Sequence, residues 1–224
     1  MLGLQLILAG FQALSTLLVS NTDAGLAFYD PTKNGGFMLD NAGGGGGEPL
    51  NVIISGLSSP AVLTDAGILH YAQAIGFSFE CLGFHLGAPQ SANLGDGNGW
   101  VNQTIELRYD FGDDDVGTCL ESLVGGNHFR VFRQNGTEAN SGALFLAVSQ
   151  EEDVWDGHTI IPDGYNVGRD LLVAAAVGHT SHDGVKYSTV AQNMTGLLAP
   201  GSTGLVNQGI ATDGVTVLLT VTIL

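Results

Sequence analysis

Three successive pieces of sequence organise this chain: NHFRVFRQNG (residues 127–136), GALFLAVSQEE (142–152) and HTIIPDGYNVGRD (158–170). In the first piece apolar and polar residues alternate, as in a strand with one buried face. The second piece is almost wholly apolar and predicts a central strand. Asn135 and Gly136 lie between the two, and this dipeptide is typical of a hairpin turn. We therefore expect the two strands to pair in antiparallel fashion.

The third piece predicts a polar loop and then a helix. Pro162, Asp163 and Gly164 are typical turn residues, and apolar residues then recur at helical spacing over residues 166–177. Towards the N-terminus, residues 50–55 predict a buried strand, and Ser59-Pro60 predicts the start of another helix, which ends at Gly76.

Further strands are expected at residues 77–83, 100–111 and 215–224. The fold class that follows is a single α+β domain with two packed helices. Its sheet is expected to be mostly antiparallel, with a mixed sheet as the alternative. These patterns do not predict the order of the strands.

The N-terminal residues predict a leader and a lead-in before the main domain. Residues 1–24 are mostly apolar and end in Thr-Asp-Ala, which is typical of a secretory signal peptide; an uncleaved membrane anchor is the alternative. Residues 25–47 form a glycine-rich lead-in, whose glycine run (43–47) is expected to separate it from the domain at 48–224. Whether the lead-in also packs at an edge is left open.

Cysteines and glycosylation signals favour an extracellular protein. Cys81 and Cys119 are the only cysteines, and in an oxidising compartment such a pair predicts a disulfide. Two buried free thiols are the alternative. Asn102, Asn135 and Asn193 each begin an N-glycosylation sequon, so the predicted protein is a secreted glycoprotein that is extracellular or associated with the cell wall.

The charge argues against several kinds of partner. The formal net charge is −16, with 6 basic and 22 acidic residues, so phosphate backbones and anionic membrane surfaces are repelled. We expect no nucleic-acid partner, and no stable membrane association once the leader is removed. The DGNG sequence at 96–99 lacks the rest of a calcium loop, and His179 and His182-Asp183 lack a third ligand at recognisable spacing. We therefore predict neither a metal nor another cofactor.

Six residues of the organising stretch are candidates for catalysis: His128, Arg130, His158, Asp163, Arg169 and Asp170. A histidine next to an aspartate can act in general acid–base chemistry, and an arginine can bind an oxyanion. The alternative is structural, with Arg169 tying the loop at 158–164 to the following helix through hydrogen bonds. A glycosidase with two paired carboxylates also fits, since its acids need not be close in sequence.

Several motifs resemble those of the LssY C-terminal-like domain. They are PLNVIISG (49–56), AIGF (74–77), HFRVFR (128–133), ALFLAVSQEED (143–153), His158 with IIPD, GRD (168–170) and TDG (212–214). The resemblance covers roughly residues 49–224, with a long insertion around 83–120. The chain departs from the family at Tyr165-Asn166 and at Gly168, where the family tends to have acids. A leader, an acidic chain and sequons together are similar to secreted proteins of filamentous fungi.

Two functional hypotheses follow. The first is a secreted extracellular or cell-surface protein with a non-catalytic role. The second is a secreted hydrolase that uses the cluster of histidine, aspartate and arginine residues. The two differ in one structural expectation, because only a hydrolase requires these side chains to converge on one open pocket.

Overall fold

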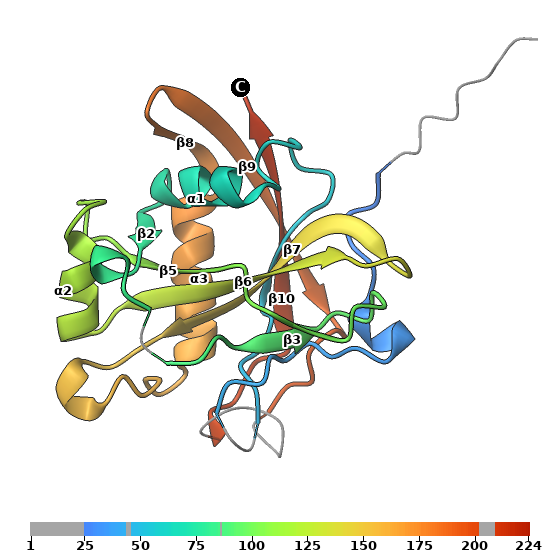
Figure 1. Cartoon of the computed structure of the whole chain (residues 1–224), viewed down its shortest axis with the longest axis horizontal. Helices are drawn as coiled ribbons and strands as arrows, with labels where there is room; N and C mark the ends of the chain where they lie inside the picture. The colour runs from blue at the N-terminus through green and yellow to red at the C-terminus, as the bar shows by residue number, and fades with distance from the viewer. Residues whose placement is uncertain (1–24, 44–45, 86, 202–208) are drawn as a thin grey trace, which may run out of the picture.

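A mostly antiparallel sheet organises the structure, which is a computed structural model that describes residues 25–43, 46–85, 87–201 and 209–224. The predicted leader, residues 1–24, lies outside the described residues. The strands are β1 (Val52–Ile54), β2 (Phe77–Phe79), β3 (Ser91–Asn93), β4 (Trp100–Asn102), β5 (Ile105–Tyr109), β6 (Asn127–Asn135), β7 (Asn140–Gln150), β8 (Gly178–His182), β9 (Val185–Thr195) and β10 (Val215–Ile223). The main sheet has the order β2-β5-β6-β7-β1-β10-β9-β8, and β3 pairs with β4 (Figure 1).

The predicted α+β class is confirmed, as is the hairpin of the organising stretch. β6 and β7 pair in antiparallel register, with Asn135 opposite Asn140 at the turn. The sheet is mixed in one place, where β1 runs parallel to β10. β7 lies in the interior of the sheet, as its apolar sequence predicts.

The expectation of two helices is incomplete, because the described residues contain a third α-helix besides the two that were predicted. The three are α1 (Asp65–Gln73), α2 (Gly117–Val124) and α3 (Gly164–Ala176). Short 3-10 helices are η1 (Pro31–Asn34), η2 (Cys81–Gly83) and η3 (Val154–Asp156). Within the part of the chain that the structure describes, none of the helices is long and apolar enough to cross a membrane.

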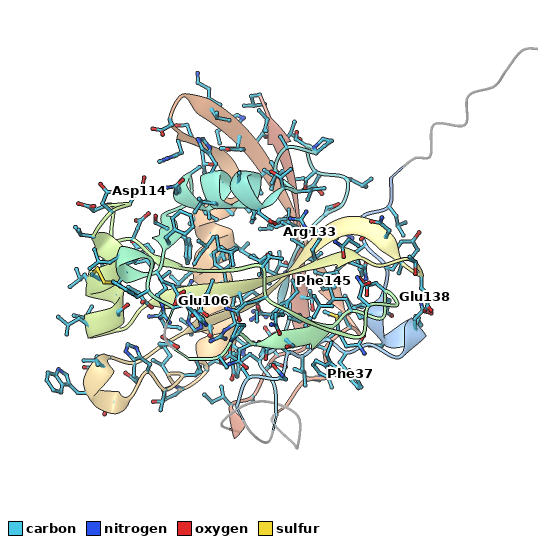
Figure 2. The ribbon with its side chains drawn as sticks, viewed as in Figure 1. Phe37, Glu106, Asp114, Arg133, Glu138 and Phe145 are labelled. Carbon is cyan, nitrogen blue, oxygen red and sulfur yellow. A yellow bond between two sulfur atoms is a disulfide. The ribbon has the colours of Figure 1, made fainter. Side chains whose placement is uncertain are left out.

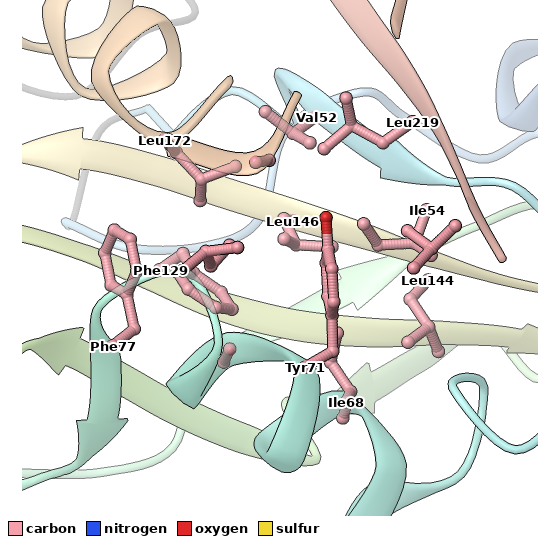
Figure 3. Close-up of a cluster of buried hydrophobic side chains, with 14 of the residues drawn as sticks. Val52, Ile54, Ile68, Tyr71, Phe77, Phe129, Leu144, Leu146, Leu172 and Leu219 are labelled. Atoms are coloured by element: carbon pink, nitrogen blue, oxygen red, sulfur yellow. The ribbon is translucent and has the colours of Figure 1, made fainter. Parts of the chain in front are cut away.

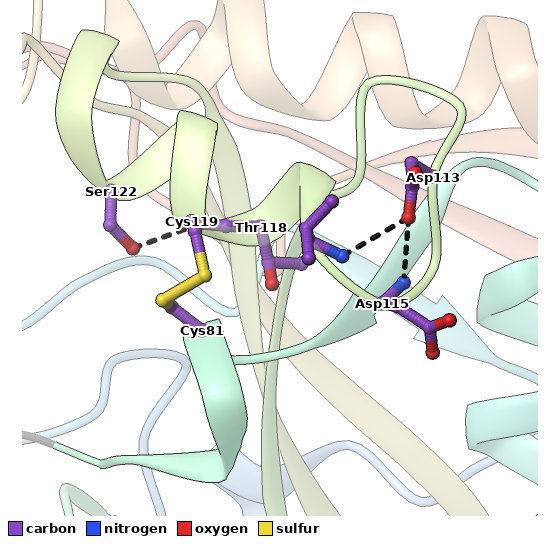
Figure 4. Close-up of a disulfide and its surroundings, with 7 residues drawn as sticks. Cys81, Asp113, Asp115, Thr118, Cys119 and Ser122 are labelled. Carbon is purple, nitrogen blue, oxygen red and sulfur yellow. Dashed lines mark hydrogen bonds between the residues drawn. A yellow bond between two sulfur atoms is a disulfide. The ribbon is translucent and has the colours of Figure 1, made fainter.

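Helix α2 has apolar residues at helical spacing, but the structure leaves this stripe exposed instead of burying it. Its buried residues are Gly117, Thr118 and Glu121, while Leu120 and Leu123 are exposed. The helix is instead attached through a disulfide between Cys119 and Cys81 of η2 (Figure 4). The predicted disulfide is thus present in the structure, and it joins two elements that bury little apolar surface of their own.

Helix α1 begins later than the sequence predicts. Its N-cap is Thr64, whose side chain accepts a hydrogen bond from the Gly67 amide, so Ser59 is not the cap. Ser59 Oγ instead accepts from the amide of Ile223 on β10. The helix ends at Gln73, with Ala74 as its C-cap, three residues before the predicted end, and a turn then leads to Gly76 with its left-handed φ of +86°.

One face of the sheet packs against α1 and α3 (Figure 3). Alternate residues of the central strands face these helices, among them Val52, Phe129, Leu146 and Leu219. Tyr71 of α1 and Leu172 of α3 are buried against them. This alternation sends the intervening residues of each strand to the opposite face.

The opposite face is covered by the lead-in and by loops. Ile53, Phe145 and Leu218 on this face pack with Met38 of the lead-in and with Ala92 of β3. Asp40 and Leu39 also form isolated bridges to Ala92 and Pro49. The described part of the lead-in therefore packs against the sheet, and its last residues bring Glu48 beside the strands.

Candidate functional site

The second face of the sheet becomes polar at its β5–β6–β7 end. Leu107 and Phe129 point to the helix-covered core, so Glu106, Arg108, His128 and Arg130 point the other way. The register places Arg108 opposite His128 and Glu106 opposite Arg130. Since this face is covered by loops and by α2, two arginines and a histidine share a partly enclosed space with glutamates.

Arg108 is at the centre of this cluster and contacts four glutamates. Its Nη1 lies 3.0 Å from Oε2 of Glu121 and 3.0 Å from Oε2 of Glu151, and its Nη2 lies 2.9 Å from Oε1 of Glu106. Its Nε lies 3.8 Å from Oε1 of Glu80. The guanidinium group therefore links α2, β5 and the end of β7, and its donors are already engaged.

Arg130 forms the second centre, and it binds Glu48, the residue that follows the lead-in. Its Nη1 lies 2.6 Å from Glu48 Oε2, and its Nε lies 3.2 Å from Glu106 Oε2. Glu106 is consequently held between two guanidinium groups, and it also accepts a hydrogen bond from Gln103 Nε2 at 3.1 Å. Its carboxylate is fixed in position from both sides; Figure 2 labels Glu106.

An open pocket of about 580 Å³ adjoins the cluster. This volume is within the range of roughly 300–1,000 Å³ that is usual for small-molecule sites. The acidic and basic residues that line it are Glu80, His85, Glu106, Arg108, Arg130, Glu151 and His158. Phe84 also lines the pocket and is 69% exposed, so an aromatic ring borders this polar cavity.

Glu80 and Glu106 form a carboxylate pair in the pocket wall, with His85 beside them. An oxygen of each carboxylate and a ring nitrogen of His85 all lie within 4.8 Å of one another. His85 Nδ1 is 2.8 Å from Glu80 Oε2 and 3.9 Å from Glu106 Oε2. Burial, followed by the charge of Glu106, raises the pKa of Glu80. The pair thus combines a carboxyl group that favours protonation with a carboxylate fixed by two arginines.

The deeper glutamates also have perturbed acidity. Burial raises the pKa of Glu48, Glu121 and Glu151 to about 7 in each case, although a neighbouring arginine opposes the shift. His128 is fully buried, and burial together with Arg130 and Arg108 holds the pKa of its imidazole well below 6.5. Groups with such shifts beside a cavity are typical of functional sites.

Three of the six catalytic candidates belong to this region. Arg130 and His158 line the pocket, and His128 lies behind it with Nδ1 3.6 Å from Glu151 Oε1. His158 Nδ1 is 3.5 Å from Oε2 of the same glutamate. Glu151, which directly follows β7, therefore lies between the two histidines.

The other three candidates lie elsewhere. Asp163 precedes α3 and accepts a hydrogen bond from Asn166 Nδ2 at 2.6 Å. Arg169, in the middle of α3, pairs with Asp213 and with its neighbour Asp170, which is not in the first turn of the helix. The predicted cluster of His158 with Asp163, Arg169 and Asp170 is therefore not assembled. Aspartates were expected as the acid–base partners of the histidines, but in the structure Glu151 lies beside His128 and His158.

None of the acidic residues of the pocket and of the adjoining cluster was among the candidates: Glu48, Glu80, Glu106, Glu121 and Glu151, with Arg108 and His85 beside them. One signal in the sequence could have indicated two of them. Glu106 and Arg108 alternate with apolar residues in the same way as His128 and Arg130, so both strands carry charge on a single face. The pairing of β5 with β6 is the further information that brings these charges together.

A second polar cluster lies at the other end of the sheet. His70 of α1 joins His182 and Asp183, with possible ligand atoms within 4.8 Å of one another. His70 Nδ1 is already 2.7 Å from the Tyr187 hydroxyl. His179, the other histidine considered in this region, is exposed on β8.

The predicted modification sites are accessible. The side chains of Asn102, Asn135 and Asn193 belong to exposed residues on β4, β6 and β9. Exposure is what attachment of a glycan requires. Glycosylation at these three residues stays a prediction.

We found no family model, no curated protein and no solved structure that matches the chain. The resemblance to the LssY C-terminal-like domain consequently stays a prediction.

Proposed function

We propose that this chain is a secreted hydrolase of neutral glycans, with Glu80 and Glu106 as its paired catalytic carboxylates. The observation that carries the proposal is the position of the pair, in the wall of an open pocket with oxygens within 4.8 Å of one another. The spacing is nearer to the roughly 5–5.5 Å between carboxyl groups in retaining glycosidases than to the roughly 6.5–9.5 Å in inverting ones.

The surroundings of the two carboxylates suit different roles. Glu106 is held by Arg108 and Arg130 and is the nucleophile, since these contacts fix the position of its carboxylate in the pocket wall. Glu80 is the general acid, because burial and the nearby Glu106 favour its protonated form. In the first step Glu80 protonates the departing glycosidic oxygen while Glu106 attacks the anomeric carbon.

The lining of the pocket supports an uncharged, polyhydroxylated substrate. Glu80, Glu106 and Glu151 supply acceptors for sugar hydroxyl groups, whereas the two guanidinium groups are already bonded to glutamates. An anionic substrate would therefore meet more repulsion than attraction. The exposed face of Phe84 offers apolar contact to a sugar ring.

Secretion is supported by the disulfide between Cys81 and Cys119 and by the three exposed sequons. The competing function is a non-catalytic extracellular role. It is favoured by the number of ion pairs around Arg108, because buried ion-pair networks also occur as purely architectural features. In that case the same residues would hold α2 against the sheet and no glycoside would be hydrolysed.

The test is hydrolysis of a panel of neutral aryl glycosides and oligosaccharides by the purified protein. We expect turnover of at least one member, with retention of anomeric configuration, and a loss of roughly 10²- to 10⁴-fold in kcat for Glu80→Gln. Glu106→Gln should abolish the formation of the intermediate. Glu138→Gln is the matched control, because Glu138 is exposed and lies far from Glu106 (Figure 2). A folded wild-type protein that hydrolyses no member of the panel would overturn the proposal.

A further inference from the structure

A second set of ligand-type side chains lies behind the pocket wall, where three elements meet. Glu121 of α2, His128 of β6 and Glu151 after β7 each place one ligand atom within 4.8 Å of the others. All three residues are buried. Imidazole nitrogen and carboxylate oxygen are donors typical of zinc and of related divalent transition metals.

One ring nitrogen of His128 makes no hydrogen bond and lies close to the carboxylates of Glu121 and Glu151. Its side chain is 0% exposed, and Nδ1 has no hydrogen-bond partner. Nδ1 lies 3.6 Å from Glu151 Oε1, which is too long for a hydrogen bond. Two ligands of one tetrahedral ion, each at roughly 2.0–2.2 Å from it, lie about 3.4 Å apart, so the observed separation fits a shared ion.

The other atoms of these side chains are positioned by neighbours. His128 Nε2 lies 3.4 Å from the Ser149 hydroxyl, a contact that orients the ring and leaves Nδ1 for a ligand. Arg108 Nη1 donates to Oε2 of Glu121 and of Glu151 at 3.0 Å each and lies 3.4 Å from Oε1 of Glu121, so Oε1 of Glu151 remains turned towards His128. The arginine and an ion can thus share the two carboxylates.

The charge balance of the cluster supports a cation. Glu48, Glu106, Glu121 and Glu151 are buried, and the cationic side chains that contact them are Arg108 and Arg130. When all are ionised, negative charges outnumber positive ones by two. Burial of uncompensated charge is costly, and one divalent ion removes this excess.

We propose that Glu121, His128 and Glu151 bind one divalent ion of the zinc type. The ion joins α2 to β6 and to the end of β7, and its fourth ligand is a water on the side of the pocket that Glu151 lines. Its role is to hold α2 in place. This proposal does not depend on Glu80 or Glu106, so the two can fail separately.

The first test is metal content. Protein treated with a chelator is mixed with Zn²⁺, passed through a desalting column and analysed for bound metal, and Co²⁺ absorption reports on the ligand geometry. We expect one equivalent per chain, a tetrahedral Co²⁺ spectrum and a higher Tm with the ion than without it. Less than a tenth of an equivalent in folded wild-type protein would overturn the proposal.

Variants locate the ion. His128→Gln and Glu121→Gln should each lower zinc affinity at least 10-fold and remove most of the gain in Tm. Glu80→Gln and His179→Ala should bind as wild type, since neither residue is a proposed ligand. His182→Ala tests the competing cluster of His70, His182 and Asp183, and loss of binding in this variant alone would contradict the assignment.

A crystallographic measurement covers the case in which the buried variants do not fold. Crystals of the wild-type protein soaked in Zn²⁺ should give an anomalous difference peak at the zinc edge within bonding distance of His128 Nδ1. A strongest peak elsewhere, or no peak, would overturn the proposal.

Discussion

At the residue scale, Arg169 is a buried arginine that links two elements through several hydrogen bonds. Its side chain is 5% exposed, and Nη1 and Nη2 lie 2.7 and 2.8 Å from the two carboxylate oxygens of Asp213. Nη1 also donates to the carbonyl of Val215 at 3.0 Å. The residue therefore joins α3 to the start of β10, whereas the expected partner was the loop at 158–164.

We predict that Arg169→Ala lowers the free energy of unfolding by about 2–3 kcal/mol, because it removes charge-assisted bonds from a buried position. Arg169→Lys should restore only part of this, since an ammonium group cannot make the paired contact with Asp213. Chemical denaturation measures the effect, with Glu138→Gln as the surface control. Unchanged stability in Arg169→Ala would contradict a structural role.

The same pair predicts a dependence on pH. The hydrogen bonds from Arg169 lower the pKa of Asp213 below its ordinary value of 3.8. A lowered pKa stabilises the folded state above the unfolded-state value, and the contribution is lost as pH falls through the folded-state value. The stability difference between wild type and Arg169→Ala should therefore be full above pH 3.8 and should shrink below it. A difference that widens on acidification would argue against the ion pair.

At the scale of elements, strands whose residues alternate between apolar and polar, or are apolar throughout, could be predicted from the sequence. Elements without such a hydrophobic pattern could not. β6, β7 and β10 follow from period-two or continuous apolar sequence. β8 has no buried residue and β9 is largely exposed, so their sequences carry little hydrophobic pattern. α2 was missed because it is only 8 residues long and begins at a glycine without a capping side chain, and because a disulfide, not a buried apolar stripe, attaches it.

We predict that the disulfide sets the stability of α2 and η2. Its closed loop spans a sequence separation of 38, for which chain entropy gives a stabilisation of about 4 kcal/mol. Reduction should lower the Tm and should speed amide hydrogen exchange in α2 before exchange rises in β6 and β7. The double variant Cys81→Ser, Cys119→Ser is the control and should not respond to reductant. Two titratable thiols in unreduced protein would exclude the bond.

At the scale of the whole molecule, the pocket depends on contacts between distant parts of the sequence. Glu48 directly follows the lead-in, Glu80 comes from the residues after β2, and Glu151 directly follows β7. Individual strands were predictable, but their order was not, and the order is what gathers these carboxylates around Arg108 and Arg130. For this reason the sequence indicated His128, Arg130 and His158 without indicating their acidic partners.

The central claim is that Glu106 attacks the substrate within the pocket, and covalent trapping tests it most directly. Fluorine at the sugar's 2-position and a good leaving group slow the second step of a retaining mechanism, so the glycosyl–enzyme intermediate accumulates. With neutral fluoroglycosides of this kind, mass spectrometry of the intact protein followed by peptide mapping should find one added glycosyl group on Glu106. The adduct should be absent in Glu106→Gln and present in Glu138→Gln. No adduct with any of the sugars, or an adduct on a residue outside the pocket, would contradict the account.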